Sequence, residues 1–333
     1  MKDNMFFLGS TVNHFEQFKV VKSHLEFSYE PIDIDELRVS ITIPTFRRPQ
    51  LLLEAVKSVA RQNTTVKFEV VIVDNDDSKE FSQQIVEALK SLSCNVRYYV
   101  NHENIGMFGN WNRCIELANA KRLTILNDDD LLDGNWLSIV AMYEQYSLVK
   151  PNSRSFTSVD EITPHSLGSS ITTKKVTLKD CFWGNINPGS LGMLFDKQAC
   201  ITLGGFNPDL YPTSDYDFLC RYINTYSSVR INANLSHYRW AENESMKKAV
   251  LEKFVCNDFD MRAAFYNQSP LISFTCRVLS VRYFERLSRI NKGLDFELIK
   301  KHIQLNDLDL KLITVFRIRF CWSLLKALTK VFL

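Results

Sequence analysis

The sequence predicts an α/β protein, with a mostly parallel sheet flanked by helices and a helical C-terminal extension. Between residues 38 and 132, short apolar runs alternate with segments of helical periodicity, which is the pattern of βαβ units. Two of the apolar runs end in consecutive aspartates, and in open α/β sheets ligands bind at the carboxyl ends of the strands. From residue 247 onward, the spacing of apolar residues is helical.

The composition is that of an ordinary folded protein, with 333 residues, 45% of them hydrophobic and 23% charged. Since 40 basic and 38 acidic residues leave a net charge of +2, the overall charge gives no reason to expect a nucleic-acid partner. The eight cysteines lack zinc-type spacing, and we expect a reduced, cytoplasmic protein. We expect neither a signal peptide nor a membrane span, because no apolar segment has the required pattern.

Four strands are predicted in the first half, each a short run of apolar and β-branched residues bounded by turn signals. They cover residues 38–43, 68–73, 96–100 and 123–126. Helical spacing predicts helices over residues 51–62, 81–92 and 110–120, connected to the strands by the turn 44–49 and the polar loop 101–109. Right-handed crossovers would make the four strands parallel.

The remaining segments are less regular. Residues 147–180 are rich in Ser, Thr and Lys and are predicted to be a variable loop region. The stretch 185–195 alternates loosely, as a strand after a turn does, and the alternative is a plain edge strand. We therefore divide the chain into an N-terminal arm (1–37) packed across a main domain (38–246), and a helical region (247–333).

The fourth predicted strand ends in Asp128, Asp129 and Asp130. Three neighbouring carboxylates repel one another unless a cation is present, and Mg²⁺ and Mn²⁺ prefer oxygen ligands and often bridge to phosphates. The alternative is an acidic turn that caps a helix beginning near Gly134. The second strand also ends in acids, beginning at Asp74, and two acidic ends on one sheet edge favour a shared ligand.

Five motifs taken together resemble the family 2 glycosyltransferases, in the family's order and spacing. They are Ile43-Pro44-Thr45-Phe46-Arg47-Arg48, Val73-Asp74-Asn75, Asn104-Ile105-Gly106, Asn110-Trp111-Asn112-Arg113 and Asn127-Asp128-Asp129-Asp130. The resemblance covers about residues 38–240 and implies a GT-A fold with a Rossmann-like sheet. It also implies an inverting enzyme that uses a nucleotide-diphosphate sugar, bound by residues 38–132, with the acceptor on residues 133–246.

The resemblance also implies the donor-site residues. Those carried over for nucleotide-sugar binding are Pro44, Thr45, Arg47, Asp74, Asn75, Asn104, Gly106, Asn112, Asp128 and Arg239. The metal ligands carried over are Asp129, at the family's usual position, and Asp130, with Mn²⁺ or Mg²⁺ as the cation. Asn127 stands where the family motif often has its first aspartate. For the turn residues the alternative is ordinary turn chemistry, and Trp111 is predicted to be core.

Further along, Gly204-Gly205-Phe206 and the acidic start of the next helix resemble the family's acceptor-side motifs. The family's catalytic base falls on Asp215, with Asp217 as a rival. The alternative for Asp215 is a first-turn acid of the helix. The segment from His237 to Trp240, with Asn243 and Ser245, resembles one that closes over the diphosphate, and Arg239 or His237 would contact phosphate.

Residues 311–333 combine five basic residues with many aliphatic and aromatic ones, and contain no acid. A basic amphipathic helix of this kind can lie in the interface of an anionic membrane leaflet. The alternative is a helix docked on the catalytic domain or on a partner subunit.

The sequence thus predicts a metal-dependent, inverting, hexosyltransferase-type enzyme acting on a saccharide or lipid-linked saccharide. Its setting would be surface polysaccharide synthesis (O-antigen or capsule), in the cytoplasm or peripherally on the inner face of the cell membrane. One rival is a sugar nucleotidyltransferase, which the absence of glycine from residues 44–49 disfavours. The other is a non-catalytic module that binds a sugar nucleotide or a lipid.

Overall fold

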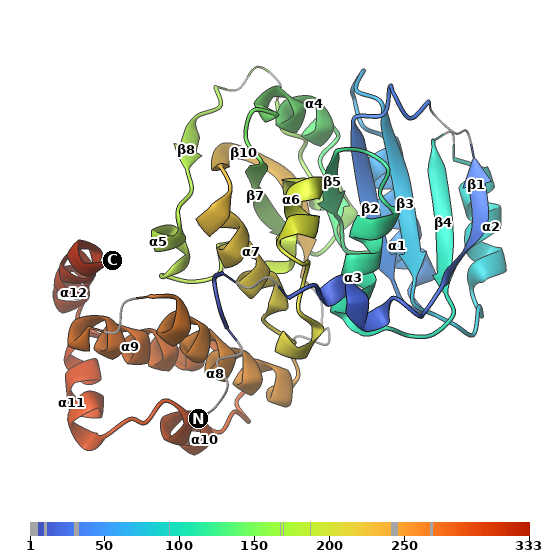
Figure 1. Cartoon of the computed structure of the whole chain (residues 1–333). Helices are drawn as coiled ribbons and strands as arrows, with labels where there is room; N and C mark the ends of the chain where they lie inside the picture. The colour runs from blue at the N-terminus through green and yellow to red at the C-terminus, as the bar shows by residue number, and fades with distance from the viewer. Residues whose placement is uncertain are drawn as a thin grey trace.

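The computed structural model describes residues 6–9, 12–29, 33–92, 94–166, 168, 170–186, 188–240, 246–266 and 269–333. Asn243 and Ser245 lie outside these ranges. The described strands form one sheet of ten, in the order β1-β4-β3-β2-β5-β9-β7-β10-β6, with β8 paired to β10 (Figure 1). Helices cover both faces of this sheet, and each face has its own apolar core.

The four predicted strands are confirmed as a parallel block. They are β2 (Val39–Thr45), β3 (Phe68–Asp74), β4 (Val96–Asn101) and β5 (Arg122–Ile125), and β2 pairs in parallel with both β3 and β5. The connecting helices are α1 (Pro49–Ala60), α2 (Ser82–Lys90) and α3 (Gly106–Leu117). The α3 helix begins earlier than the predicted residue 110, because the side chains of Asn75 and Asn104 accept the backbone N–H groups of Ile105 and Gly106.

Beyond β5, the sheet becomes mixed. Its further elements are β6 (Leu131–Leu132), α4 (Trp136–Val140), β7 (Leu148–Phe156), β8 (Thr173–Lys175), α5 (Leu178–Cys181), β9 (Leu194–Asp196), α6 (Lys197–Thr202), α7 (Ser214–Thr225) and β10 (Ser228–Arg239). β9 is antiparallel to β5 and β7, whereas β7 and β10 are parallel. The carboxyl ends of β2, β3, β5, β7 and β10 therefore share one edge.

One sequence prediction in this half is wrong. Residues 147–180 contain an inner strand, β7, which composition hides because Lys150-Pro151-Asn152-Ser153-Arg154 is polar. For residues 185–195, the predicted turn and following strand are present as the 3₁₀ turn Pro188–Ser190 and the first residues of β9. This strand is short and lies inside the sheet, so the alternative of a plain edge strand is wrong.

The N-terminal segment contributes more than a packing arm. Residues Ser23–Tyr29 form β1, which pairs antiparallel with β4 at the sheet edge, and His14–Phe18 form a 3₁₀ helix beside α3. The Arg113 guanidinium of α3 donates to the carbonyls of Phe18 and Val21, at 3.1 and 2.8 Å, and so fixes this segment.

The helical prediction for the C-terminal region is confirmed. It comprises α8 (Lys248–Phe265), α9 (Pro270–Leu287), α10 (Phe296–His302), α11 (Asp307–Val315) and α12 (Arg319–Phe332), which share a separate apolar cluster (Figure 1). In the part of the chain that the structure describes, no helix is both long and apolar enough to cross a bilayer.

Candidate active site

The aspartates after β5 are held in three different ways. Asp130 is buried, with one carboxylate oxygen accepting from the Arg239 backbone N–H at 2.9 Å and the other from the Asn127 amide at 3.0 Å. Asp128 accepts from the Thr45 hydroxyl at 2.8 Å. Asp129 is more exposed and lies 3.1 Å from the Arg48 guanidinium.

These environments change the acidity of the carboxyl groups. Burial raises the pKa of Asp128 to about 6. Burial, together with the charge of Asp129, raises the pKa of Asp130 to about 7. Each anion is therefore poorly stabilised, and a cation would relieve the repulsion between them.

The donor set suits a hard divalent cation, because carboxylate oxygens are the ligands that Mg²⁺ and Mn²⁺ prefer. Among the described residues, no three His, Cys, Asp or Glu side chains are already grouped as a metal site. Asp129 offers the most accessible carboxylate of the three, whereas Asp130 is turned toward Arg239 and Asn127. The geometry thus favours Asp129 over Asp130 as the direct ligand.

A second polar cluster lies at the end of β3, beside the first. The carboxylate of Asp74 accepts from the Tyr98 hydroxyl at 2.8 Å and from the Asp76 N–H at 3.0 Å. Burial raises the pKa of Asp74 to about 6. Arg47, with a positive φ of 54°, donates through Nε to Asp76 at 3.1 Å, so the turn after β2 and the end of β3 are tied together.

Asp76 is a site candidate that the sequence prediction did not select. Its side chain is buried, and its Oδ2 atom has no hydrogen-bond partner among the described residues. Although burial by itself raises its pKa, the hydrogen bonds from Ser78 and Arg47 hold the pKa of Asp76 below its usual value. The only sequence signal was the presence of additional acids after Asp74-Asn75.

Asn75 and Asn104 hold the loop that precedes α3. The Asn75 amide donates to Asn104 Oδ1 at 2.7 Å and accepts from the Ile105 N–H at 3.0 Å. Gly106 follows with a φ of +72° and open space around its α-carbon. These residues lie at the same sheet edge as Asp74, and their hydrogen bonds fix the conformation of the loop formed by residues 104–106.

Asn112 is not brought to this edge. Its buried amide donates to the Phe206 carbonyl and accepts from the Phe206 N–H, both at 2.8 Å. It therefore joins α3 to the turn that precedes α7. The neighbouring Trp111 is buried against Phe108 and Phe206, as predicted for a core residue.

Asp215 lies in the first turn of α7 and is buried. Its Oδ2 accepts from the Gly189 N–H at 2.8 Å and from the Asn185 amide at 3.2 Å, while its Oδ1 has no partner in the part of the chain that is described. Burial raises the pKa of this carboxyl. An unpartnered carboxylate oxygen with raised proton affinity is suited to accept a proton.

Asp217, the rival base, has a different environment. It pairs with Arg221 at 2.9 Å, and both side chains are almost fully buried. The same guanidinium donates to the carbonyls of Leu203 and Gly205, at 2.7 and 2.8 Å. Asp217 is thus neutralised by Arg221 and helps to hold the turn around Gly205 in place, which is a structural role.

The turn Pro188–Ser190 brings Asp215 next to the acidic loop. Gly189 has a φ of +72°, and a Cβ atom placed on it would lie 3.1 Å from the Asn127 amide nitrogen. The same residue donates to Asp215. One glycine therefore contacts both the loop of Asp128–Asp130 and the candidate base, which the sequence separates by 85 positions (215 − 130).

Arg239, at the end of β10, fixes the acidic loop from the other side. Besides its backbone bond to Asp130, its Nε donates to the Asp129 carbonyl at 2.8 Å, and its guanidinium pairs with Glu54. The guanidinium lies 4.6 Å from the centre of the Phe156 ring. His237 is buried instead, with Nε2 3.7 Å from Asp133.

Two solved structures share the fold of this chain, which is of the GT-A type. The TarS fragment 1–349 from S. aureus, in complex with UDP-GlcNAc, has a TM-score of 0.56 at 16% identity, covering 78% of this chain and 77% of that chain. The mannosyltransferase PcManGT from Pyrobaculum calidifontis, in complex with GDP-Man and Mn²⁺, has a TM-score of 0.52 at 14% identity, covering 83% of each chain.

A family model matches part of the sequence. Residues 40–198, a little under half of the chain, match the model described as glycosyl transferase family 2, which supports the resemblance for this segment.

Two curated relatives match shorter stretches. The GalNAc(5)-diNAcBac-PP-undecaprenol beta-1,3-glucosyltransferase of Campylobacter jejuni is 34% identical over 99 residues, 29% of this chain and 31% of that protein. The putative colanic acid biosynthesis glycosyl transferase WcaA of Escherichia coli is 37% identical over 108 residues, 32% of this chain and 38% of that protein. The matches thus span about a third of either relative.

Proposed function

We propose that this protein is an inverting glycosyltransferase. It would move a sugar from a nucleotide-diphosphate donor to a hydroxyl of a saccharide or lipid-linked saccharide. The observation that carries the proposal is the buried Oδ1 of Asp215, unpartnered among the described residues and connected through Gly189 to the acidic loop. A candidate base and a candidate diphosphate site are thereby connected through one glycine.

The donor nucleotide would lie across the ends of β2 and β3. Asp74 and Asp76 offer acceptors for the N–H groups of a base, and Arg47 and Arg48 offer donors for phosphate oxygens. A divalent cation bound at Asp129 would supply neutralisation of the diphosphate charge as it departs. The loop formed by Asn104, Ile105 and Gly106 would contact the nucleoside of the donor.

In the transfer step, Asp215 takes the proton of the acceptor hydroxyl. The acceptor oxygen forms a bond to the anomeric carbon while the bond from that carbon to the phosphate oxygen breaks, and its electron pair leaves with the nucleoside diphosphate. Attack on the face opposite the leaving group inverts the anomeric configuration. The raised pKa of Asp215, caused by burial, strengthens it as a base.

A setting in polysaccharide assembly is favoured by the relatives named for colanic acid and for an undecaprenol-linked saccharide. The helix α12 adds a candidate site of membrane contact within residues 311–333, because Phe320, Leu324, Leu328 and Val331 form an exposed stripe on one face. We therefore include peripheral contact with an anionic leaflet on the cytoplasmic side in the proposal.

The first test is donor binding. UDP-, GDP- and dTDP-sugars are screened by thermal shift, each with and without Mn²⁺, because a ligand that binds the native state raises its melting temperature. We expect one nucleotide class to raise the melting temperature, and to raise it more with Mn²⁺. If none does, the protein is not a nucleotide-sugar enzyme. A nucleotidyltransferase would instead bind a nucleoside triphosphate.

The second test replaces the base. Asp215→Asn is expected to lower the transfer rate about a hundredfold to ten-thousandfold, the usual contribution of general base catalysis, without loss of donor binding. Asp209→Asn, an exposed acid in the preceding turn, is the control and should leave the rate unchanged. An Asp215→Asn protein with full transfer activity would eliminate Asp215 as the base.

A further inference from the structure

An open, basic sheet face lies on the acceptor side of the proposed active site. On β7, alternate positions carry Lys150, Asn152 and Arg154, and on the parallel neighbour β10 they carry Arg230, Asn232 and Asn234. The pairing register places Lys150 opposite Arg230 and Asn152 opposite Asn234. Side chains at alternate positions share one face of a sheet, so these three cations and three amides lie on one side of it, with Lys150 buried and both arginines exposed. We call these six residues the basic face.

The charges of the basic face are not compensated within the described part of the protein. Arg230 donates to Asn152 Oδ1 at 3.0 and 2.8 Å. With its amide oxygen turned toward Arg154, Asn234 accepts from that guanidinium at 3.1 and 3.0 Å. These partners are neutral, and neither arginine forms an ion pair with any described residue. The two guanidinium groups are thus held in position while retaining full positive charge.

Lys150 lies at the base of this face and is 4% exposed. Within the described ranges, its Nζ has a single hydrogen bond, to the Pro151 carbonyl at 3.3 Å. Burial, and then the nearby charge of Arg230, lower the pKa of this ammonium group to about 8. A buried lysine beside a like charge destabilises the fold, and an anion bound at the face would remove that penalty.

The basic face lies on the same side of the sheet as Asp215. Leu148, two residues before Lys150, packs in the cluster that contains Tyr216 and Phe218 of α7. At the other end of the face, Arg154 of β7 lies opposite His237 of β10 in the strand register. Arg239, two residues beyond His237, donates its backbone N–H to Asp130. The face therefore runs along β7 and β10 toward the acidic loop.

We propose that the basic face binds the phosphoryl group of a saccharide phosphate that serves as acceptor, while a hydroxyl of its saccharide reaches Asp215. Arginine guanidinium groups bind phosphate oxygens through charge-assisted hydrogen bonds. The Asn152 amide is engaged by Arg230 and Asn232, so Asn232 and Asn234 would be the ones to offer amide groups to sugar hydroxyls. This rests on the proposed glycosyltransferase function and narrows its acceptor to an anionic class.

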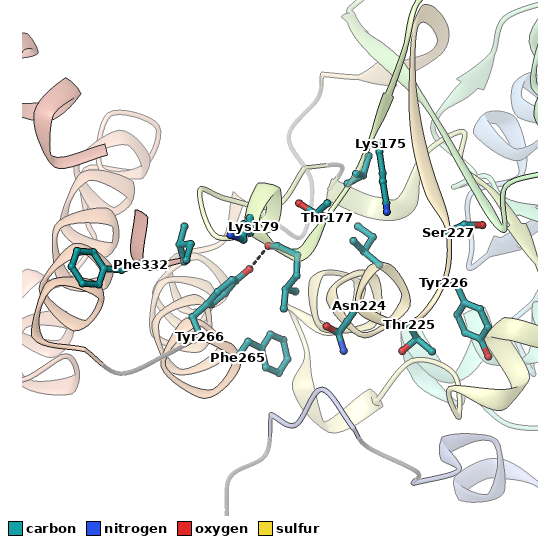
Figure 2. Close-up of a pocket in the computed structure, with 14 residues that line it drawn as sticks. Lys175, Thr177, Lys179, Asn224, Thr225, Tyr226, Ser227, Phe265, Tyr266 and Phe332 are labelled. Atoms are coloured by element: carbon teal, nitrogen blue, oxygen red, sulfur yellow. Dashed lines mark hydrogen bonds between the residues drawn. The ribbon is translucent and has the colours of Figure 1, made fainter. Parts of the chain in front are cut away.

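The structure has a pocket on another part of the surface, and none of the six residues of the basic face lines it. It has a volume of about 650 Å³ and lies between α5, the end of α7 and the C-terminus, with Lys175, Tyr226 and Phe332 in its lining (Figure 2). In the pairing of β8 with β10, Lys174 lies opposite Arg230, whereas Lys175, the next residue of β8, lines this pocket. Lys175 thus provides a control cation on the neighbouring strand.

The test measures protection of arginines from phenylglyoxal by mass spectrometry, with glucose 1-phosphate, glucose, inorganic phosphate and phosphatidylcholine–phosphatidylglycerol vesicles as separate probes. We expect glucose 1-phosphate to protect Arg154 and Arg230, and to do so better than glucose or inorganic phosphate. Protection equally strong with inorganic phosphate would leave only a simple anion site. Protection only by vesicles would make the face a lipid contact. Either result overturns the proposal.

Affinity supplies the second readout. Binding of glucose 1-phosphate is expected to weaken about tenfold or more in the double variant Arg154→Gln, Arg230→Gln, and to remain unchanged in Lys175→Gln. Unchanged affinity in a folded double variant also overturns the proposal. The nucleotide-sugar thermal shift on the unmodified protein is scored separately, so that a failed donor site is distinguished from a failed basic face.

Discussion

Two aspartates in the first turn of α7 show how environment separates function from structure at the scale of single residues. Asp215 has a buried oxygen, unpartnered among the described residues, beside the acidic loop, whereas Asp217 is fully engaged with Arg221. The sequence pattern left both as candidates for the base. The ion pair with Arg221, one helical turn further along α7, is what excludes Asp217 as the candidate base.

Asp217→Asn is expected to destabilise the protein by about 3 kcal/mol, because it leaves the buried Arg221 without a counter-ion. Urea unfolding followed by circular dichroism measures the loss. At a temperature where the variant stays folded, its transfer rate should remain close to that of the unmodified protein. A variant with native stability and no transfer would instead identify Asp217 as the base.

Lys150→Met is expected to raise the free energy of unfolding at pH 7 by up to about 3 kcal/mol, given a pKa lowered from 10.5 to about 8. Because the lowered pKa penalises the folded state whenever the lysine is charged in both states, the penalty is full below pH 8. It fades as the pH rises from 8 to 10.5.

The gain from Lys150→Met should therefore shrink across that pH range, in unfolding curves measured at pH 7 and pH 10.5. A variant less stable than the unmodified protein at pH 7 would show that Lys150 has a stabilising partner. The same variant should bind glucose 1-phosphate more weakly, since the basic face loses its third cation.

Individual site residues could be predicted only where a motif carried them. Asp129 and Asp215 were implied by the resemblance to the family's strand-end and helix-start motifs, and Gly189 lies between Asp215 and the loop that contains Asp129. Arg48 lies within a motif and Asp76 directly follows one, but their contacts depend on the positive φ of Arg47 and on side chains from distant elements. Asn112 matched a motif position, yet its amide holds Phe206.

At the scale of elements, the turn Pro188–Ser190 is the piece that joins the two halves of the site. The sequence predicted a turn before a strand here but gave no sign of what the turn contacts. Gly189, one of its two residues with a positive φ, lies between Asn127 and Asp215. The conformation of such a short turn depends on its tertiary contacts, which the periodicity of the sequence does not predict.

Gly189→Ala should lower the transfer rate more than the stability. A side chain at a φ of +72° costs about 1 kcal/mol, and the added methyl group must also displace the Asn127 amide. Gly106→Ala has the same φ but open space, so it isolates the backbone strain in unfolding experiments. The transfer rate at saturating donor distinguishes the two variants, because we expect it to fall more in Gly189→Ala than in Gly106→Ala. Normal turnover in the Gly189→Ala variant would show that the turn does not position Asp215.

Strands β2 to β5 were predictable because each is an apolar run followed by an amphipathic helix. Strand β7 was not, since its outer half carries the polar residues of the basic face, and its pairing with β9 and β10 supplies the order that its composition lacks. Strand β1 has a mostly exposed pattern and is stabilised by pairing with β4 and by packing of Phe27 and Tyr29 on the core. Polar composition therefore concealed an inner strand, β7, and an edge strand, β1.

At the scale of the whole molecule, the C-terminal helices form a group beside the sheet (Figure 1). Their last element, α12, leaves an apolar stripe exposed. On α12, Phe320 is 76% exposed and Val331 is 79% exposed. Residues 311–333 contain five basic residues and no acid. An anionic bilayer surface matches both the stripe and the charge, and would hold a lipid-linked acceptor near the basic face.

We expect the protein to co-sediment with vesicles of phosphatidylcholine and phosphatidylglycerol at 3:1, a ratio of about the anionic content such helices need, and to bind phosphatidylcholine alone more weakly. The double variant Phe320→Glu, Leu324→Glu should bind about tenfold less, because two apolar side chains no longer enter the interface and two negative charges are added. Met142→Glu alters an equally exposed apolar residue on the sheet domain and should not change vesicle binding. If α12 instead covers a second copy of the chain, sedimentation velocity will show a dimer that the double variant dissociates, with no vesicle binding. That result would place the acceptor's membrane contact outside this helix.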